Sequence, residues 1–131
     1  MKKLILIINL FTIASLGIFA QENQNSTNDS IVFEKIIHDY GKIFQGSEGI
    51  CNFKFTNKGK MPLFLSNVRA SCGCTVPEWP KEPIAPGKDG VIKVKYNTNS
   101  PGSFNKSITV NSNAKNSTVI LQIKGNVIIK E

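Results

Sequence analysis

The pair Cys72 and Cys74, separated by a single glycine, has the residue types and spacing most able to do chemistry in this sequence. In an extended strand their Cα atoms would lie near or beyond the limit of about 6.8 Å for a disulfide. Because Gly73 can adopt a positive φ, a turn at that residue would let the two sulfurs meet. A third cysteine, Cys51, leaves the total odd, and its bridge to Cys72 or Cys74 is the alternative pairing.

The chemical roles open to this pair are structural, redox and metal-binding. The one-residue spacing differs from the Cys-x-x-Cys of thioredoxin-like proteins, and a closed zinc site would need all three cysteines together with His38. Copper(I) needs fewer soft ligands, which Cys72 and Cys74 could supply with help from Met61. We expect a structural disulfide or packed thiols, with no cofactor. The alternative is an envelope thiol protein that uses Cys72 and Cys74 to bind copper(I) or to exchange disulfides.

The sequence offers little support for an enzyme. His38 is the only histidine, and in a continuous strand its neighbour Asp39 would point to the opposite face. Glu78 and Glu82 flank Trp79, but a pair of acids in a proline-rich segment is typical of a solvated surface. General-base schemes rely most often on histidine, and the sequence has no Gly-x-Ser-x-Gly elbow. We therefore predict no catalytic residues and no enzymatic activity.

Residues 1–20 have the pattern of a secretory signal peptide. A basic start, Met1-Lys2-Lys3, precedes an apolar run that ends just before Ala20. This run is shorter than the roughly 20 residues of a spanning helix. We therefore expect cleavage after Ala20, no membrane span afterwards, and export to the periplasm, the cell envelope or the medium. Residues 21–30 contain no apolar side chain, which predicts a flexible polar tether.

The composition beyond residue 20 favours β-strands. This part of the chain holds 20 Ile plus Val against 3 Leu and 3 Ala, and β-branched side chains pack well on a pleated sheet. Alternation is clearest at Cys51, Phe53 and Phe55, which would share the inward face of one strand. We predict that residues 31–131 form one all-β domain, an immunoglobulin-like β-sandwich of about seven strands. The expected strands cover residues 31–37 (closed by a turn at 38–41), 50–56, 63–70, 90–97, 104–111 and 118–127.

Residues 75–89 break this pattern. They hold four of the six prolines, and because proline lacks the donor that a central strand needs, we expect a connection and not a strand. The segment also holds the only tryptophan, which we expect to fold over the edge of the sandwich. It is either a rigid loop that covers the core or a binding loop. The candidate binding residues are Pro77, Trp79, Pro80, Pro83 and Pro86.

Residues 71–80 read Ser-Cys-Gly-Cys-Thr-Val-Pro-Glu-Trp-Pro, and this block resembles the core motif of a family of exported bacterial domains of unknown function. The resemblance covers roughly residues 33–127. It implies an immunoglobulin-like sandwich similar to major sperm protein and to pilus chaperones, and no established activity. Cys51 lies outside the motif, so the resemblance implies no role for it. Further matches to the family pattern are Asp39-Tyr40-Gly41, Phe53, Phe55, Asn57, Gly59, Pro62-Leu63, Phe104-Asn105-Lys106 and Val110-x-Ser112-Asn113.

The positive charge is carried almost entirely by lysine. The formal net charge of the chain is +7, and removal of residues 1–20 would lower it to +5. Arg69 is the only arginine, and readers of nucleic acid favour arginine, so we expect no nucleic-acid partner. We predict an extracytoplasmic binding or structural module whose partner is another envelope protein or a peptide strand added to a sheet edge. The lysines expected to face outward are Lys54, Lys93, Lys95 and Lys124.

Overall fold

The computed structural model describes residues 30–131, which form eight β-strands and no helix. No helix of the length and hydropathy needed to cross a membrane is therefore found in this part of the chain. The predicted signal peptide (1–20) lies outside the described residues, as does the predicted tether (21–30) except for Ser30. The strands are β1 (Ile31–Phe33), β2 (Ile37–Phe44), β3 (Gly49–Asn57), β4 (Leu65–Ala70), β5 (Thr75–Glu78), β6 (Asp89–Tyr96), β7 (Gly102–Ser112) and β8 (Thr118–Ile128).

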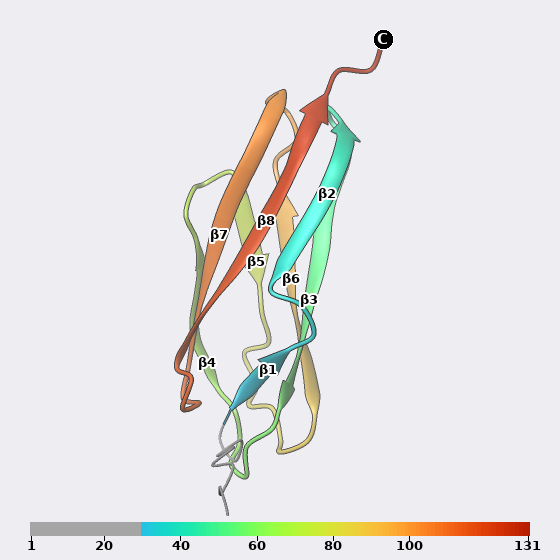
Figure 1. Cartoon of the computed structure of the whole chain (residues 1–131). Helices are drawn as coiled ribbons and strands as arrows, with labels where there is room; N and C mark the ends of the chain where they lie inside the picture. Colours follow the sequence, from blue (N-terminus) through green and yellow to red (C-terminus); the bar gives the residue numbers. More distant parts are fainter. Residues whose placement is uncertain (1–29) are drawn as a thin grey trace, which may run out of the picture.

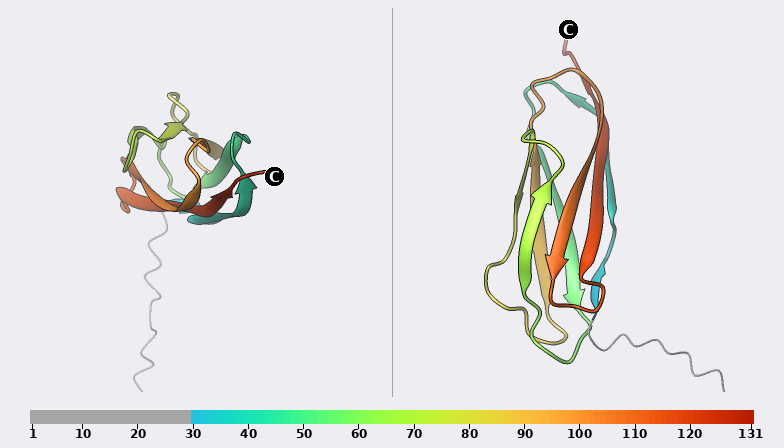
Figure 2. Two further views of the ribbon diagram at one scale, coloured as in Figure 1. Left: turned by 90° about the horizontal axis from the view of Figure 1, so that it is seen from above. Right: turned by 90° about the vertical axis from the view of Figure 1, so that its left-hand side faces the viewer.

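The eight strands form two four-stranded sheets that pack face to face (Figures 1 and 2). Sheet A has the strand order β1-β3-β6-β5, and sheet B has the order β2-β8-β7-β4. All neighbouring strands run antiparallel except β2 and β8, which are parallel. The all-β, immunoglobulin-like sandwich predicted from the sequence is confirmed, with eight strands where about seven were expected.

The core fills the space between the two sheets. Burial alternates along β3, where Cys51, Phe53 and Phe55 point inward as predicted and are buried. Complete burial of a side chain such as phenylalanine or isoleucine contributes roughly 1.5–3 kcal/mol. The period-2 pattern of the sequence therefore supplies the main stabilising term of the fold. Other side chains that line the core are Ile92, Val94, Ile108, Val110, Leu121, Ile123 and Val127.

The prediction of one strand over residues 31–37, closed by a turn at 38–41, is wrong. The chain leaves sheet A after Phe33 and enters sheet B at Ile37, so this stretch belongs to two strands in different sheets. The expected turn residues lie inside β2, where the register against β8 shifts between Asp39 and Lys42. Gly41 adopts a φ of 64° there and receives support from Asp39, whose Oδ1 accepts a hydrogen bond of 2.8 Å from its amide. A bulge thus takes the place of the expected chain reversal.

The prediction that residues 75–89 contain no strand is also wrong. Thr75–Glu78 form β5, which pairs with β6 at the edge of sheet A. Asn97 N–H donates to the Cys74 carbonyl at 2.8 Å, and in an antiparallel ladder the backbone groups of successive residues alternate in direction. The backbone groups of Pro77 therefore point away from β6. Its missing N–H costs the ladder nothing, because proline is tolerated at this side of an edge strand.

Candidate functional site

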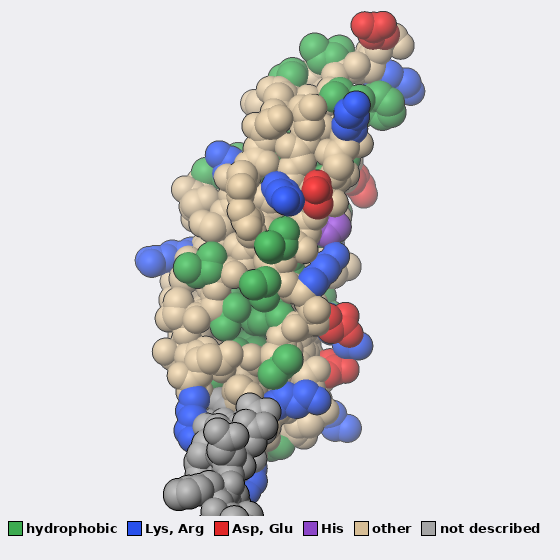
Figure 3. Space-filling view, viewed as in Figure 1, with side chains coloured by type: hydrophobic (Ala, Val, Ile, Leu, Met, Phe, Trp, Pro, Cys, Tyr) green, Lys and Arg blue, Asp and Glu red, His purple; other side chains and the backbone are tan. Residues whose placement is uncertain are grey.

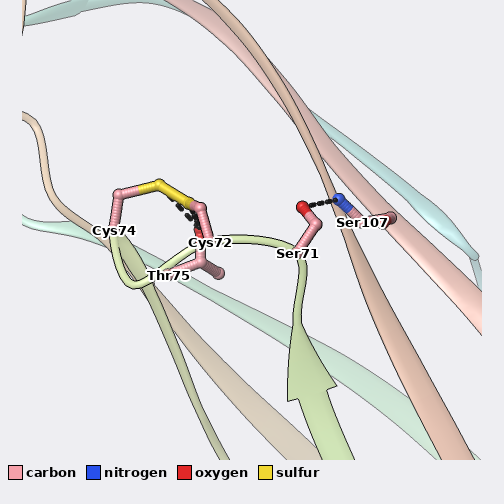
Figure 4. Close-up of a disulfide and its surroundings, with 5 residues drawn as sticks. All are labelled: Ser71, Cys72, Cys74, Thr75 and Ser107. Carbon is pink, nitrogen blue, oxygen red and sulfur yellow. Dashed lines mark hydrogen bonds between the residues drawn. A yellow bond between two sulfur atoms is a disulfide. The ribbon is translucent and has the colours of Figure 1, made fainter.

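A disulfide between Cys72 and Cys74 lies at the turn where the chain passes from sheet B to sheet A. The two Cα atoms of this disulfide are 5.3 Å apart (Figure 4). The free cysteine, Cys51, is buried in the core. The hydroxyl of Thr75, itself buried, lies 3.8 Å from each sulfur. The turn therefore presents a sulfur pair with one buried hydroxyl beneath it.

The turn is anchored to both sheets. On one side, Ser71 N–H donates to the Ser107 carbonyl at 2.9 Å, and Ser107 N–H donates to Ser71 Oγ at 3.2 Å. On the other side, Asn97 N–H donates to the Cys74 carbonyl at 2.8 Å. A cross-link that closes a loop of three residues removes little entropy from the unfolded chain, so it adds only about 1–2 kcal/mol to the free energy of unfolding. The effect of this disulfide on the shape of the turn is therefore its more specific contribution.

A hollow of about 460 Å³ opens beside the disulfide, at one end of the sandwich. Three chain reversals form it: the β2–β3 turn, the β4–β5 turn with the start of β5, and the β6–β7 turn with the end of β6. Loops at the end of an immunoglobulin-like sandwich are a common place for binding. The lining residues are Gly46, Ser47, Glu48, Gly73, Cys74, Val76, Lys95, Tyr96, Asn97, Thr98 and Asn99.

Hydrogen bonds hold two walls of the hollow together. Gly46 N–H donates to the Thr98 carbonyl at 3.3 Å, and Thr98 Oγ1 donates to the Ser47 carbonyl at 2.6 Å. Gln45 Nε2 also donates to the Asn99 carbonyl at 2.7 Å. The β2–β3 and β6–β7 turns are thus fixed to each other before any ligand arrives. A preformed wall of this kind lowers the ordering cost of binding.

The hollow is lined by charged and apolar side chains. It combines one acid, Glu48, with one base, Lys95, and with Val76, whose side chain is 56% exposed. Lys95 is paired with Val76 in the register of β6 and β5, so the base and the apolar side chain lie side by side on the outer face of sheet A. Sequence analysis missed Glu48 and the β6–β7 turn. The glycine and asparagine residues around them predict turns but give no sign of a binding site.

The structure does not bring Met61 to the cysteine pair. Met61 precedes β4 and the cysteines follow it, and six strand residues span about 20 Å. Its side chain is largely exposed and lines a different hollow, of about 260 Å³, next to Pro62 and Asn113. Within residues 30–131, no group of three or more His, Cys, Asp and Glu side chains is placed to hold a metal ion.

The proline-rich segment after β5 closes one side of the sandwich. Leu63 and Ile84 exchange two backbone hydrogen bonds of 2.8 Å, so the chain before β4 pairs with this segment and β4 begins only at Leu65, two residues later than predicted. Trp79 packs against the core and carries Lys81 Nζ 3.0 Å above its ring. These contacts are those of a covering loop, and of the predicted loop residues Pro77 lies nearest to the hollow, next to Val76.

Asn57 is a buried residue that sequence analysis did not single out as structural. Its Nδ2 donates to the carbonyl oxygens of Met61 and Ile84, at 2.8 and 2.9 Å, and its Oδ1 accepts from Gly59 N–H at 2.9 Å. One side chain thus joins the end of β3 to two loops. The signal was present in the sequence, because Asn57 and Gly59 belong to the resemblance described above.

The single histidine has no catalytic partner among residues 30–131. Burial and the nearby Lys35 ammonium lower the pKa of His38, and its ring packs edge-on against Tyr40 at 4.5 Å. Burial raises the pKa of Tyr40 and also that of the Cys51 thiol. These shifts keep His38, Tyr40 and Cys51 uncharged, and an uncharged thiol is a poor nucleophile. Asp39 interacts with the Gly41 amide, and no acid orients His38 as a general base.

A family model matches residues 31–127, most of the described chain, and its description is "Protein of unknown function (DUF1573)". The chain belongs to this family. The family resemblance derived from the sequence is therefore confirmed at the level of the domain. No curated protein matches the sequence.

Solved structures similar to this DUF1573 domain share its sandwich fold. A protein of unknown function from Porphyromonas gingivalis W83 is 15% identical with a TM-score of 0.67, over 76% of this chain and 47% of that chain. The chain thus spans about half the length of that protein. PapD-like domain 7 of human CEP192 is 8% identical with a TM-score of 0.67, over 80% and 89%. The CsuC-CsuE chaperone-tip adhesion subunit complex of Acinetobacter baumannii is 14% identical with a TM-score of 0.55, over 75% and 57%.

Proposed function

We propose that this DUF1573 domain is an exported, non-catalytic binding module that holds another envelope protein at the disulfide end of the sandwich. The observation that carries the proposal is the hollow of about 460 Å³, whose walls are three turns fixed by hydrogen bonds and by the Cys72–Cys74 bridge. Export rests on the signal-peptide pattern of residues 1–20. An oxidising compartment suits the disulfide at this turn.

A partner at this end meets side chains and turns and not a free strand edge. The outward backbone of β5 offers no free donor, because Pro77 has no N–H and Thr75 N–H already donates to the Cys72 carbonyl at 3.4 Å. A foreign strand needs such donors to extend a sheet. The exposed side chain of Val76, together with Lys95 beside it on β6 and with Glu48 of the β2–β3 turn, therefore supplies the contacts. The fold supports this role by analogy, since the CsuC-CsuE structure is that of a chaperone with an adhesion subunit.

Site-specific photo-cross-linking tests this function. A photoreactive phenylalanine derivative replaces Val76 in one variant and Val91 in the other, and both are expressed in the native host. Val91 is a matched control because it is also exposed, at 44%, on the outer face of sheet A but outside the hollow. We expect one discrete cross-linked partner from position 76 and none from position 91. Glu48→Lys should reduce the yield of that adduct severalfold. The same adduct at both positions, or an adduct at neither, would contradict the proposal.

The second candidate function is disulfide exchange at the same turn. Cys74 lines the hollow, and the Thr75 hydroxyl lies close enough to donate to a thiolate on either sulfur. A partner dithiol would reduce the Cys72–Cys74 bridge to two thiols and would itself become a disulfide, with two electrons and two protons transferred. Intact mass after alkylation of the chain isolated from its compartment separates the two functions. One disulfide with the buried Cys51 protected supports the binding module, whereas alkylated Cys72 and Cys74 support exchange.

A further inference from the structure

The outer edge of β2 presents backbone groups that have no strand partner within residues 30–131. Gln122 N–H donates to the Ile36 carbonyl and Gln45 N–H to the Ile128 carbonyl, both at 2.8 Å, which fixes the residues of β2 that face β8. Backbone groups of alternate residues point the other way, and the bulge shifts this alternation by one residue. The residues whose backbone N–H and C=O groups point away from β8 are therefore Ile37, Asp39, Lys42 and Phe44.

The other sheet edges are more protected. At the edge of β1, the side chain of Asn116 accepts from Ile31 N–H at 3.0 Å and donates to the Ile31 carbonyl at 2.8 Å. At the edge of β5, Pro77 removes the outward donor. The edge of β4 is shorter, and there the backbone groups of Val68 and Ala70 point away from β7. An open edge is a template for another strand, so β2 is the place where one is expected.

The sequence of β2 is complementary to itself across a two-fold axis between Tyr40 and Gly41. An antiparallel copy centred on that axis places Asp39 opposite Lys42 of the second copy, and Ile37 opposite Phe44 of the second copy. The backbone groups of all four residues point away from β8, so Asp39 and Lys42 can form the hydrogen-bonded pair of an antiparallel ladder, while Phe44 adds its amide opposite Ile37. The two bulges then lie opposite each other, and the spacing between pairs is equal on both strands. The register about this axis pairs opposite charges and aligns the backbone hydrogen-bonding groups at the same time, and a shift of one residue would lose both.

The side chains agree with the same register. Ile37 is 47% exposed and Phe44 is 49% exposed, and both lie on the outer face of sheet B, as Asp39 and Lys42 do. Asp39 also neighbours Lys124 in the register of β8, so charges would alternate across the joined sheets. Figure 3 shows basic and acidic side chains together on the side of the molecule where β2 runs. The Phe44 carbonyl already accepts from Ser47, which leaves the Phe44 amide for the ladder.

We propose that two copies of this chain associate edge to edge through β2, with Asp39 of each copy against Lys42 of the other. The result is one continuous eight-stranded sheet made from two copies of sheet B. The contact is one strand wide, so it is a small interface of the weak, reversible kind. It lies on the β2 edge, apart from the three turns that form the hollow, and its failure would leave the proposed binding function untouched.

Charge exchange tests this dimer. Sedimentation velocity of the purified wild-type chain over a range of concentrations should show a reversible monomer–dimer equilibrium. Lys42→Asp and Asp39→Lys should each raise the dissociation constant at least tenfold, because each sets like charges opposite each other. An equal mixture of the two variants should regain association, since the mixed dimer restores both opposite-charge pairs. Lys93→Asp, an exposed lysine on sheet A, is the control and should associate as the wild type does.

Several outcomes would overturn the dimer. A wild type that stays monomeric at every concentration would show that Lys42 and the bulge keep the edge unpaired. Equal association of wild type and Lys42→Asp would place the interface elsewhere. Asp39→Lys also loses the contact to the Gly41 amide, so circular dichroism must show that this variant is folded. No side-chain hydrogen bond of Lys42 is found among residues 30–131, so Lys42→Asp keeps the test decisive if Asp39→Lys does not fold.

Discussion

Tyr40 donates a hydrogen bond of 2.8 Å to the carbonyl oxygen of Gly49, which joins β2 in sheet B to β3 in sheet A. These strands follow each other in the chain but belong to opposite sheets. The ring of Tyr40 also packs against the rings of Phe104 and His38. The bond therefore fixes how the edge of one sheet sits on the other.

Tyr40→Phe should lower the free energy of unfolding by about 1 kcal/mol, because it removes one partly buried hydrogen bond and keeps the ring. Urea denaturation followed by tryptophan fluorescence measures the change. Tyr96→Phe is the matched control: Tyr96 is buried and stacked on Phe104, and no hydrogen bond of its hydroxyl is found in the described chain. An equal loss in both variants would show that the Tyr40–Gly49 bond has no special weight.

Asn57→Ala should cost about 2–3 kcal/mol, since three backbone groups lose their partner at once: the carbonyls of Met61 and Ile84 and the Gly59 amide. Thermal and chemical denaturation give the value. Asn52→Ala, at an exposed position of the same strand, should change stability by less than about 0.5 kcal/mol. A small loss at Asn57 would mean that water satisfies the two loops equally well.

Stability should fall as the pH drops through the ordinary pKa of histidine. Burial and the Lys35 ammonium depress the pKa of His38 in the folded state, so the unfolded chain binds its proton first. The contribution of His38 is therefore complete above about pH 6.5 and is lost progressively in more acidic solution. Thermal melts from pH 8 to pH 5 should show a weaker slope for His38→Gln than for wild type. Identical slopes would remove His38 from the pH response.

Replacement of Cys72 and Cys74 together by serine should lower the free energy of unfolding by only about 1–2 kcal/mol, because the closed loop has three residues. The domain should remain folded, while cross-linking from position 76 should weaken as the turn loosens. Reduction of the wild-type chain should cause the same loss of stability and the same weakening of the photo-cross-link. A Cys51→Ala variant should still form the photo-cross-link from position 76. Complete unfolding of the double variant would contradict this local role.

Pro77→Thr should leave the β5–β6 ladder intact, since the backbone groups of residue 77 point away from β6. It would add an outward donor to the edge of sheet A, and an unprotected edge promotes pairing between chains. We expect faster aggregation at 37 °C by light scattering, with little change in the melting temperature. Pro80→Thr, beyond the end of β5, serves as the control and should aggregate at the wild-type rate.

The class of fold and most of the core residues follow from local properties of the sequence. An excess of β-branched residues and an alternation such as Cys51, Phe53 and Phe55 are local properties, because side chains of a strand alternate whichever strand lies next to it. The family resemblance at residues 71–80 and the outward lysines were readable for the same reason. These lysines are exposed in the structure.

The connections between these strands, and the backbone groups that their edges leave unpaired, depend on the tertiary structure. The change of sheet after Phe33, the bulge at Gly41 and the edge position of Pro77 depend on which distant strand supplies the hydrogen bonds, and a single sequence does not carry that pairing. The hollow likewise needs Glu48, Cys74 and Asn97, which come from three turns and meet only when the sandwich closes. Side-chain period is a local property, whereas the direction of a backbone donor is set by its partner strand.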